Sequence, residues 1–274
     1  MSKVRLVAHP GALVGESVRM DGGDVLMLDP PNRRLLRWST VDGSLRDTLL
    51  SIPIWSLGML PDGSWAGAGE EGFCLVDVRT GAITAGPPAS LGPGCRFNDM
   101  TVDACGGLWV GSMHRGLLSG KGGLYYAPHP DAPVEQVADG LGVANGMAFT
   151  AGGATLLVVD TLSRTLLAYA RSGDATTLQE PVVVTDFLGV PGKPDGMTIA
   201  PDGAVWVAMW GGGCIVRLAG NGAVEQMVSI PAPHVGSLAF APDGHAYVSS
   251  SRARLSEAVL QANPDSGGLF RVSL

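Results

Sequence analysis

The sequence predicts an all-β protein folded as a six-bladed β-propeller of four-stranded antiparallel blades, and three observations support this. The 274 residues include 40 glycines and 19 prolines, so turns are abundant and long helices are scarce. Short β-rich runs follow turn signals in "DGGDVLML", "PDGSWAGA", "CGGLWVGS", "AGGATLLVV", "PDGAVWVAM" and "PDGHAYVSS". The marker glycines of these runs lie 41 to 50 residues apart, at Gly22, Gly63, Gly107, Gly153, Gly203 and Gly244. A period of about 40 to 50 residues with several strands per repeat is typical of propeller blades.

Individual segments fit this architecture. Six repeats of about 45 residues fill the chain, so we expect a single domain over residues 1–274. The runs "LVVDTLSRTLLAYA" (157–170) and "VWVAMWGGGCIVRL" (205–218) each predict two strands joined by a tight turn. The final "GGLFRVSL" predicts another strand, and "VRLVAH" near the start is expected to pair into the closing blade. Only "RLSEAVLQAN" (254–263) has helical character.

Composition limits the classes of partner. Hydrophobic residues make up 46% of the chain and charged residues 16%, which supports a sizeable core. The net charge of −7 argues against nucleic acid or an anionic membrane surface as a partner. The opening "MSKVRLVAHP" has no apolar signal-peptide region, and no stretch is apolar enough to predict a membrane span. We therefore expect a cytoplasmic protein that is a monomer or a weak homo-oligomer.

The cysteines show neither a C-x-x-C pair nor the spacing of a metal site. They are Cys74, Cys95, Cys105 and Cys214. Because each lies in or near an apolar stretch, we expect all four to be reduced, small and buried.

Polar residues recur at one place in the repeat. Trp55, Asn145, Asp195 and Gly236 each lie eight residues before a marker glycine. Asn98 lies eight or nine residues before its glycine, and Glu16 lies six or seven before its own. Because the first strand of each blade borders the channel of a propeller, these positions are expected to meet at one mouth of the ring.

Such a cluster predicts a metal site. It would bring together Glu16, Asn98, Asn145 and Asp195, which supply two carboxylates and two amides. Unpaired buried carboxylates are costly, and a divalent cation would offset their repulsion. Oxygen ligands suit Ca²⁺, Mg²⁺ or Mn²⁺ better than they suit a zinc site of His and Cys. The alternative is that these residues only tie neighbouring hairpins together.

At these residues the sequence resembles the gluconolactonase, senescence marker protein and regucalcin family. The matching phrases are "GES", "RFNDMTVDACGGLWVGSMH", "VANGMAF", "KPDGMTIAPDGAVWVAMWGGG" and "SGGLFRV", from about residue 14 to the C-terminus. The resemblance implies a six-bladed propeller with one divalent metal held by Glu16, Asn145 and Asp195, with Asn98 nearby. Ca²⁺ is expected first, with Mg²⁺, Mn²⁺, Zn²⁺ or Fe²⁺ as alternatives. The chain departs from the family's sequence pattern at Ser17–Met20 and at Met100. These departures are expected to change the shape of the substrate pocket and the substrate that it accepts.

The function that follows is hydrolysis of a small-molecule sugar lactone, such as glucono-lactone, to the aldonic acid. Asp195 is the first candidate for the general base and Asp99 the second. Arg96 is expected to bind sugar hydroxyls or the developing carboxylate, because its planar guanidinium suits both. Its alternative is an ion pair with an aspartate between blades.

Other residues and other functions stay open. Besides Arg96 and Asn98, we expect Trp55 and His114 to line the substrate site, with packing or solvent-facing roles as their alternatives. No G-x-S-x-G motif predicts a serine hydrolase. Two alternative functions are a metal-binding propeller without turnover, calcium-responsive or a scaffold, and a metal-dependent phosphotriesterase.

Overall fold

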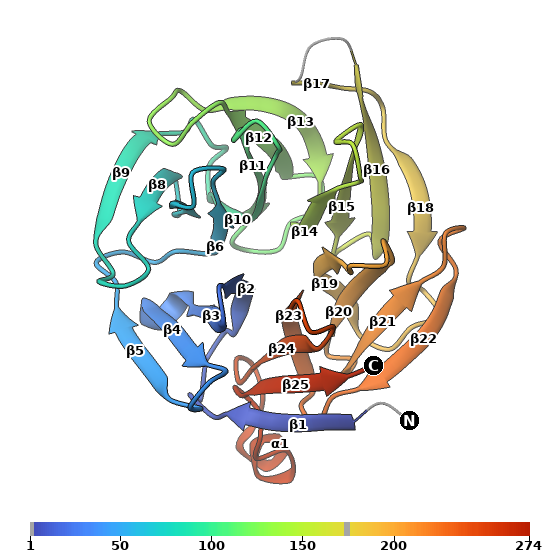
Figure 1. The fold of residues 1–274 in the computed structure, drawn as a ribbon. Helices are drawn as coiled ribbons and strands as arrows, with labels where there is room; N and C mark the ends of the chain where they lie inside the picture. Colours follow the sequence, from blue (N-terminus) through green and yellow to red (C-terminus); the bar gives the residue numbers. More distant parts are fainter. Residues whose placement is uncertain (1–2, 173–175) are drawn as a thin grey trace. The chain divides into compact units, whose positions relative to one another are not determined.

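The structure is a computed structural model and describes residues 3–172 and 176–274. These residues form strands β1 to β25, one short helix, α1 (Glu257–Ala262), and one 3-10 turn, η1 (Pro30–Asn32) (Figure 1). The strands pair in antiparallel fashion within each of the described sheets. Among the described residues, no helix combines the length and the apolar character needed to span a bilayer.

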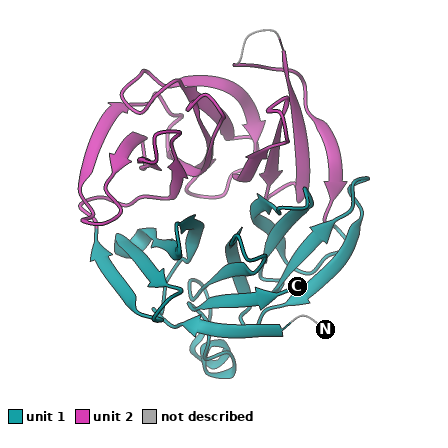
Figure 2. Cartoon of the chain, in the orientation of Figure 1, with its two compact units in different colours: residues 1–49, 188–274 teal, residues 50–187 magenta. Residues whose placement is uncertain are grey.

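The chain divides into two compact units (Figure 2). Unit 1 contains residues 1–49 and 188–274, and unit 2 contains residues 50–187. Each unit is built from antiparallel sheets in which most neighbouring strands are consecutive in the chain; β1 with β25, β20 with β23 and β16 with β18 are the exceptions among the described strands.

Unit 1 contains two sheets. The first has four strands in chain order: β2 (Glu16–Asp21), β3 (Asp24–Asp29), β4 (Arg34–Ser39) and β5 (Leu45–Leu49). The second has eight strands: β1 (Lys3–Ala8), β25 (Leu269–Ser273), β24 (Ala246–Ser251), β23 (His234–Phe240), β20 (Val205–Trp210), β21 (Cys214–Leu218), β22 (Val224–Ser229) and β19 (Lys193–Ile199), the last paired with β20.

Unit 2 contains three sheets. The first consists of β6 (Ser56–Met59), β7 (Trp65–Ala68), β8 (Gly72–Val76) and β9 (Ile83–Pro88). The second consists of β10 (Cys95–Val102), β11 (Leu108–His114), β12 (Gly122–Ala127) and β13 (Glu135–Leu141). The third consists of β14 (Ala144–Phe149), β15 (Thr155–Asp160), β16 (Thr165–Ser172), β17 (Thr177–Leu178) and β18 (Val182–Asp186), with β18 also paired to β16.

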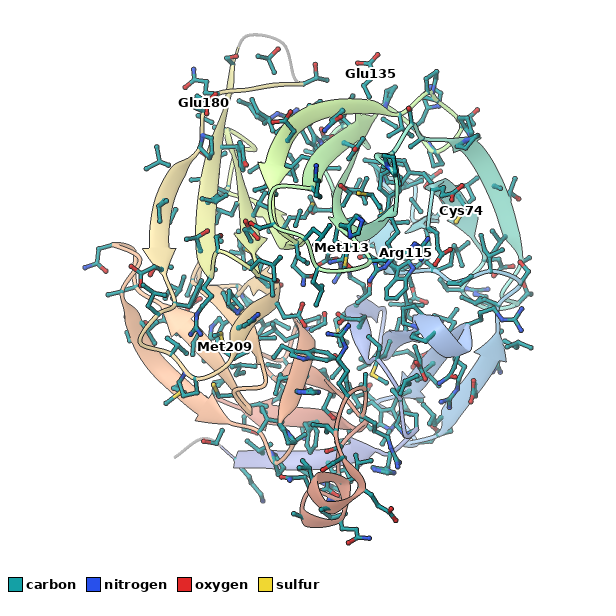
Figure 3. All side chains as sticks on the ribbon, turned by 180° about the vertical axis from the view of Figure 1, so that it is seen from behind. Cys74, Met113, Arg115, Glu135, Glu180 and Met209 are labelled. Carbon is teal, nitrogen blue, oxygen red and sulfur yellow. The ribbon has the colours of Figure 1, made fainter. Side chains whose placement is uncertain are left out.

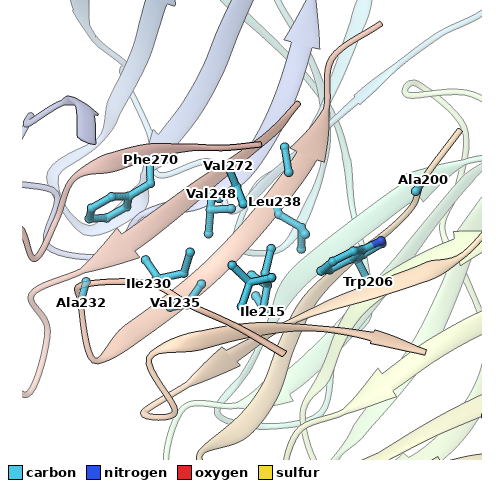
Figure 4. Close-up of a cluster of buried hydrophobic side chains, with 13 residues drawn as sticks. Ala200, Trp206, Ile215, Ile230, Ala232, Val235, Leu238, Val248, Phe270 and Val272 are labelled. Atoms are coloured by element: carbon cyan, nitrogen blue, oxygen red, sulfur yellow. The ribbon is translucent and has the colours of Figure 1, made fainter. Parts of the chain in front are cut away.

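Strands inside the sheets, such as β7 and β24, are buried on both faces, whereas an outer strand such as β5 is mostly exposed. In the eight-stranded sheet the cluster around Trp206, Ile215, Val235 and Phe270 is almost completely buried (Figure 4). Unit 2 has a comparable cluster around Trp109 and the inner faces of β14 and β15. These cores hold the first strand of each repeat in place.

Most of the expected elements are present. The runs at 157–170 and 205–218 form β15–β16 and β20–β21, and β1 pairs with β25 as predicted for the two ends of the chain. Three sheets have the predicted four antiparallel strands. The eight-stranded sheet differs from two separate four-stranded sheets because Trp210 pairs with His234, which joins β20 to β23.

The cysteine prediction is wrong at one position. All four cysteines are free thiols, and Cys74, Cys95 and Cys214 are buried, but Cys105 is exposed. Cys105 lies in the turn between β10 and β11, where its backbone N–H donates to the Asp103 carboxylate, so its side chain faces solvent.

Candidate functional site

The first strand of five repeats carries a β-bulge. In each, the pairing register shifts by one residue, so two residues face one on the next strand. The residues within these shifts are Ser17–Val18 in β2, Asn98–Asp99 in β10, Asn145–Gly146 in β14, Asp195–Gly196 in β19 and Gly236–Ser237 in β23. Bulges re-aim side chains and are frequent beside active sites. Asn98, Asn145 and Asp195 thus occupy the same position in their bulges.

Glu16 lies one residue before its bulge. The first bulge residue, Ser17, is buried and has a φ of 50°, in the left-handed region that side chains rarely adopt. A left-handed first residue defines the bulge type that glycine normally occupies. Ser17 therefore moves the bulge of β2 one residue along the chain, and Glu16 keeps the regular pairing with Leu28.

Two buried aspartates anchor the chain directly before Glu16 and Asn145. The Asp29 carboxylate accepts from the backbone N–H groups of residues 13 and 14, at 3.1 and 3.2 Å. The Asp160 carboxylate accepts from those of residues 142 and 143, both at 3.0 Å. In each case the second N–H lies two residues before the candidate ligand. By this anchor Glu16 is the counterpart of Asn145, although their bulges differ by one residue.

Serine side chains from β23 and β24 hold the backbone around Glu16. The Val18 N–H donates to Ser237 Oγ at 3.0 Å, and Ser249 Oγ donates to the Gly15 carbonyl at 2.7 Å. These bonds are buried, where a hydrogen bond costs most to lose. They fix the direction in which Glu16 leaves the strand.

Gly236 makes room for the Glu16 carboxylate. A Cβ at Gly236 would lie 2.5 Å from the Gly15 carbonyl oxygen and 3.2 Å from Glu16 Oε1. A Cβ at Gly196 would lie 2.6 Å from the Gly236 carbonyl oxygen. The bulges of β2, β23 and β19 therefore approach each other closely within unit 1. Asp195, which precedes Gly196, is buried with 5% of its surface exposed.

In unit 2 two buried amides make hydrogen bonds beyond their own strands. Asn98 Nδ2 donates to the Ala144 carbonyl at 3.1 Å, and Asn98 Oδ1 accepts from Arg96 at 2.9 Å. These two partners fix the orientation of the amide, because only the nitrogen can donate to a carbonyl and only the oxygen can accept from guanidinium. Asn145 Nδ2 donates to Thr161 Oγ1 at 3.1 Å. Its Oδ1 is thereby turned away from Thr161.

Arg96 lies on the face of Trp55. The guanidinium carbon is 3.3 Å from the centre of the indole ring, and the same guanidinium donates to the Phe97 carbonyl at 2.6 Å. Arg96 is buried, with 9% of its surface exposed. A cation held against an aromatic face and by hydrogen bonds is well positioned. Trp55, Arg96 and Asn98, which we expected at the substrate site, thus form one cluster.

Asp99 connects two strands. Its Oδ1 accepts from Ser56 Oγ at 2.6 Å and from the Met100 N–H at 2.8 Å. These bonds tie β10 to the start of β6. The structure places Asp99 directly beside Asn98 in the bulge, with one carboxylate oxygen engaged in this connection.

His114 is the last residue of β11 and pairs with Cys95 at the start of β10. Its Nδ1 accepts from the Gly116 N–H at 3.0 Å, so a neutral ring carries its proton on Nε2.

The neighbouring Arg115, labelled in Figure 3, forms an ion pair with Glu70 at 2.9 Å. This hydrogen bond, followed by weaker attraction from Arg96, lowers the pKa of the Glu70 carboxyl.

Sequence reasoning missed the groups that hold these side chains in place. Asp29 and Asp160 end the apolar runs "DVLMLD" and "TLLVVD", so an aspartate closing a buried strand is the signal that could have identified them. The serines of β24 left a weaker signal, a run of three at 249–251. Over residues 3–172 and 176–274, no three His, Cys, Asp or Glu side chains gather in a group that could hold a metal.

Comparison with known proteins gives a consistent result. Residues 14–252 match the family model described as the SMP-30/Gluconolactonase/LRE-like region. Regucalcin of Oryctolagus cuniculus is 24% identical over 281 aligned positions, covering 99% of this chain and 94% of that protein. L-arabinolactonase of Azospirillum brasilense is 29% identical over 202 positions, covering 72% of this chain and 66% of that protein.

A solved structure shares the fold. The crystal structure of a calcium-binding protein, regucalcin, from Agrobacterium tumefaciens superposes with a TM-score of 0.90 and 26% identity. The match covers 99% of this chain and 94% of that one. These matches support a β-propeller fold over nearly the whole length of the chain.

Proposed function

The chain belongs to the SMP-30/gluconolactonase/LRE-like family, and from this premise we propose that it is a divalent-metal-dependent lactonase acting on a sugar lactone. The relative named L-arabinolactonase supports hydrolysis of a lactone ester. We further propose a single domain of six blades, which the six sequence repeats support, and residence in the cytoplasm as a monomer or weak homo-oligomer.

The equivalence of the bulges carries the proposal. Oxygen-bearing side chains stand at the same place in several repeats, and the Asp29 and Asp160 anchors make Glu16 the counterpart of Asn145. We propose Glu16, Asn145 and Asp195 as the ligands of one divalent cation, with Ca²⁺ as the first candidate.

The residues present fit such an ion. Two carboxylates and an amide oxygen are the hard ligands that Ca²⁺, Mg²⁺ and Mn²⁺ prefer. Gly236 leaves the Glu16 carboxylate space that a Cβ would take. The hydrogen bond from Asn145 to Thr161 uses the amide nitrogen, which is the end that cannot bind a cation.

The bound cation would polarise the lactone carbonyl and lower the pKa of a bound water. Asp195 would accept a proton from the water whose oxygen attacks the carbonyl carbon. The ring C–O bond then breaks, and the proton passes from Asp195 to the departing ring oxygen, which gives the hydroxy acid. Asp99 is the second candidate for this base.

Arg96 would position the substrate. Its charge, held against Trp55 and beside Asn98, suits sugar hydroxyls and the carboxylate formed on ring opening. Trp55 would act by holding Arg96 as well as by lining the site. His114 would contribute its Nε2–H as a hydrogen-bond donor at the end of β11.

The test is lactone hydrolysis by protein stripped of metal with a chelator, followed by a pH indicator before and after addition of Ca²⁺, Mg²⁺, Mn²⁺, Zn²⁺ or Fe²⁺. A panel of aldonolactones is compared, with spontaneous hydrolysis measured in the same buffer and metal without protein and the Asp195→Asn protein assayed beside the wild type. Turnover restored by metal supports the proposal. Tight calcium binding without turnover on any lactone would overturn it in favour of a calcium-binding protein, an outcome that the calcium-binding regucalcin structure makes worth testing.

A further inference from the structure

Two aromatic rings in unit 1, which are not part of the cluster of Trp55, Arg96 and Asn98, stack on each other. The ring centres of Trp210 and His234 lie 4.4 Å apart, and their planes differ by only 16°. Their backbones pair, which joins the end of β20 to the start of β23. Both side chains are partly exposed, so the stack borders solvent. Figure 3 labels Met209, the residue directly before Trp210.

Both rings belong to residues close in the strands to Asp195, the proposed general base, and to Gly236. Trp210 pairs with Lys193, which is two residues before Asp195 in β19. His234 is two residues before Gly236, the residue that leaves room for the Glu16 carboxylate. The rings therefore lie at the same end of the strands as Asp195 and Gly236.

The backbone around the stack is tightly fitted. A Cβ at Gly192 would lie 2.5 Å from the Trp210 carbonyl oxygen, and one at Gly212 would lie 2.2 Å from the Pro191 carbonyl oxygen. Val235, next to His234, is fully buried in the cluster shown in Figure 4. The backbone that carries the two rings is therefore closely packed.

His234 is suited to an uncharged stack. Burial lowers the pKa of its ring, and nearby Arg254 acts in the same direction. The Ala253 backbone opposes this shift, but burial of the ring outweighs it. At neutral pH the pair therefore consists of two neutral, stacked and partly exposed rings.

We propose that Trp210 and His234 form an aromatic platform that binds the carbon skeleton of the sugar lactone through its C–H face. This inference rests on the proposed function. Small-molecule sites are lined mainly by aromatic and apolar groups, with few polar groups to fix orientation. The Glu16 and Asp195 carboxylates of the same unit would provide polar contacts, and the platform would select substrates with an extended carbon skeleton over small unsubstituted lactones.

The test compares KM and kcat of Trp210→Leu, Trp210→Phe and His234→Ala on an aldonolactone and on γ-butyrolactone. His245→Ala is the matched control, because His245 lies in the turn at the other end of β23 and β24. We expect the aldonolactone KM to rise about 10-fold in Trp210→Leu, the size of one lost aromatic contact. We expect kcat to change little, Trp210→Phe to retain most binding, and γ-butyrolactone kinetics to stay near wild type.

A binding measurement separates this inference from the proposed function. Titration with the aldonate product is expected to change tryptophan fluorescence in the wild-type protein and much less in Trp210→Phe. Wild-type turnover with an unchanged aldonolactone KM in both Trp210→Leu and His234→Ala overturns the platform and leaves the lactonase intact. Absence of turnover on every lactone overturns the lactonase. A fluorescence response that depends on Trp210 would then still support the platform, and its absence would overturn both.

Discussion

Asp29 and Asp160 make the same pair of hydrogen bonds in two different repeats, each accepting from two successive backbone N–H groups of the chain that enters the preceding strand of its sheet. Both carboxylates are buried, with 0% and 5% of their surface exposed. Charge-assisted bonds to backbone N–H groups are stronger than neutral ones. The pair therefore sets the positions from which Glu16 and Asn145 leave their strands.

Replacing Asp160 with Asn is expected to destabilise the protein by about 2 kcal/mol, the scale of lost hydrogen bonds to a buried charged group. The Asn amide can keep its oxygen toward the N–H donors of residues 143 and 162, but its NH₂ group would then face the N–H donor of residue 142. Urea unfolding measures the change. Asp202→Asn is the control, since 57% of that side chain is exposed and its ion pair with Arg217 is worth less than about 1 kcal/mol. Equal losses in the two variants would contradict the anchoring role.

The sequence predicts the repeat well because turns have strong local requirements. Gly63, Gly203 and Gly244 have φ values of 83° to 84°, which glycine adopts without the cost that other residues incur. Fixed turns and alternating apolar residues then determine where the strands lie. The positions of Asn98, Asn145 and Asp195 follow from counting back from such turns.

Features that depend on contacts between repeats could not be predicted in this way. The one-residue offset at Glu16 arises from the left-handed backbone of Ser17, a conformation that no local pattern announces for serine. The pairing of Trp210 with His234 joins segments of separate repeats. The placement of Arg96 on Trp55 likewise depends on packing between two sheets of unit 2 rather than on spacing along the chain.

Gly236→Ala is expected to reduce both stability and metal affinity. Its Cβ would lie 2.5 Å from the Gly15 carbonyl oxygen and would press on the Glu16 carboxylate. Overpacking of this kind typically costs about 1 to 3 kcal/mol. Gly220→Ala is a matched control in the same unit, because a Cβ there meets no atom within 4 Å. Calcium titration and urea unfolding of the two variants check the prediction, and equal behaviour would show that Gly236 does not shape the site.

Asp195→Asn and Glu16→Gln should have different effects. If Asp195 is the general base, its amide variant folds normally and loses at least about 10²-fold in turnover. Glu16→Gln removes a charge from the proposed ligand set, so we expect weaker metal binding and activity that recovers partly at higher metal concentration. Asp195→Asn also removes a charge from the ligand set, but the loss of the base persists at saturating metal, so steady-state kinetics over a metal series distinguishes the two. Near wild-type turnover in Asp195→Asn would transfer the role of base to Asp99, and an unchanged metal titration would remove Glu16 from the ligands.

His234 is expected to make stability depend on pH in the mildly acidic range. Burial lowers its pKa below the ordinary value of 6.5, with Arg254 adding to the shift and the Ala253 hydrogen bond opposing it. The unfolded chain therefore binds this proton first as the pH falls through 6.5. The free energy of unfolding is expected to decrease there, with a slope of at most about 1.4 kcal/mol per pH unit for one group. Above pH 6.5 His234 is neutral in both the folded and the unfolded protein, and its contribution to the free energy of unfolding is fully present.

Urea unfolding at pH 7.5, 6.5 and 5.5 should show a shallower decrease for His234→Gln than for the wild type. His245→Gln should keep the wild-type slope. A shallower slope in His245→Gln alone would contradict the prediction and attribute the pH dependence to His245.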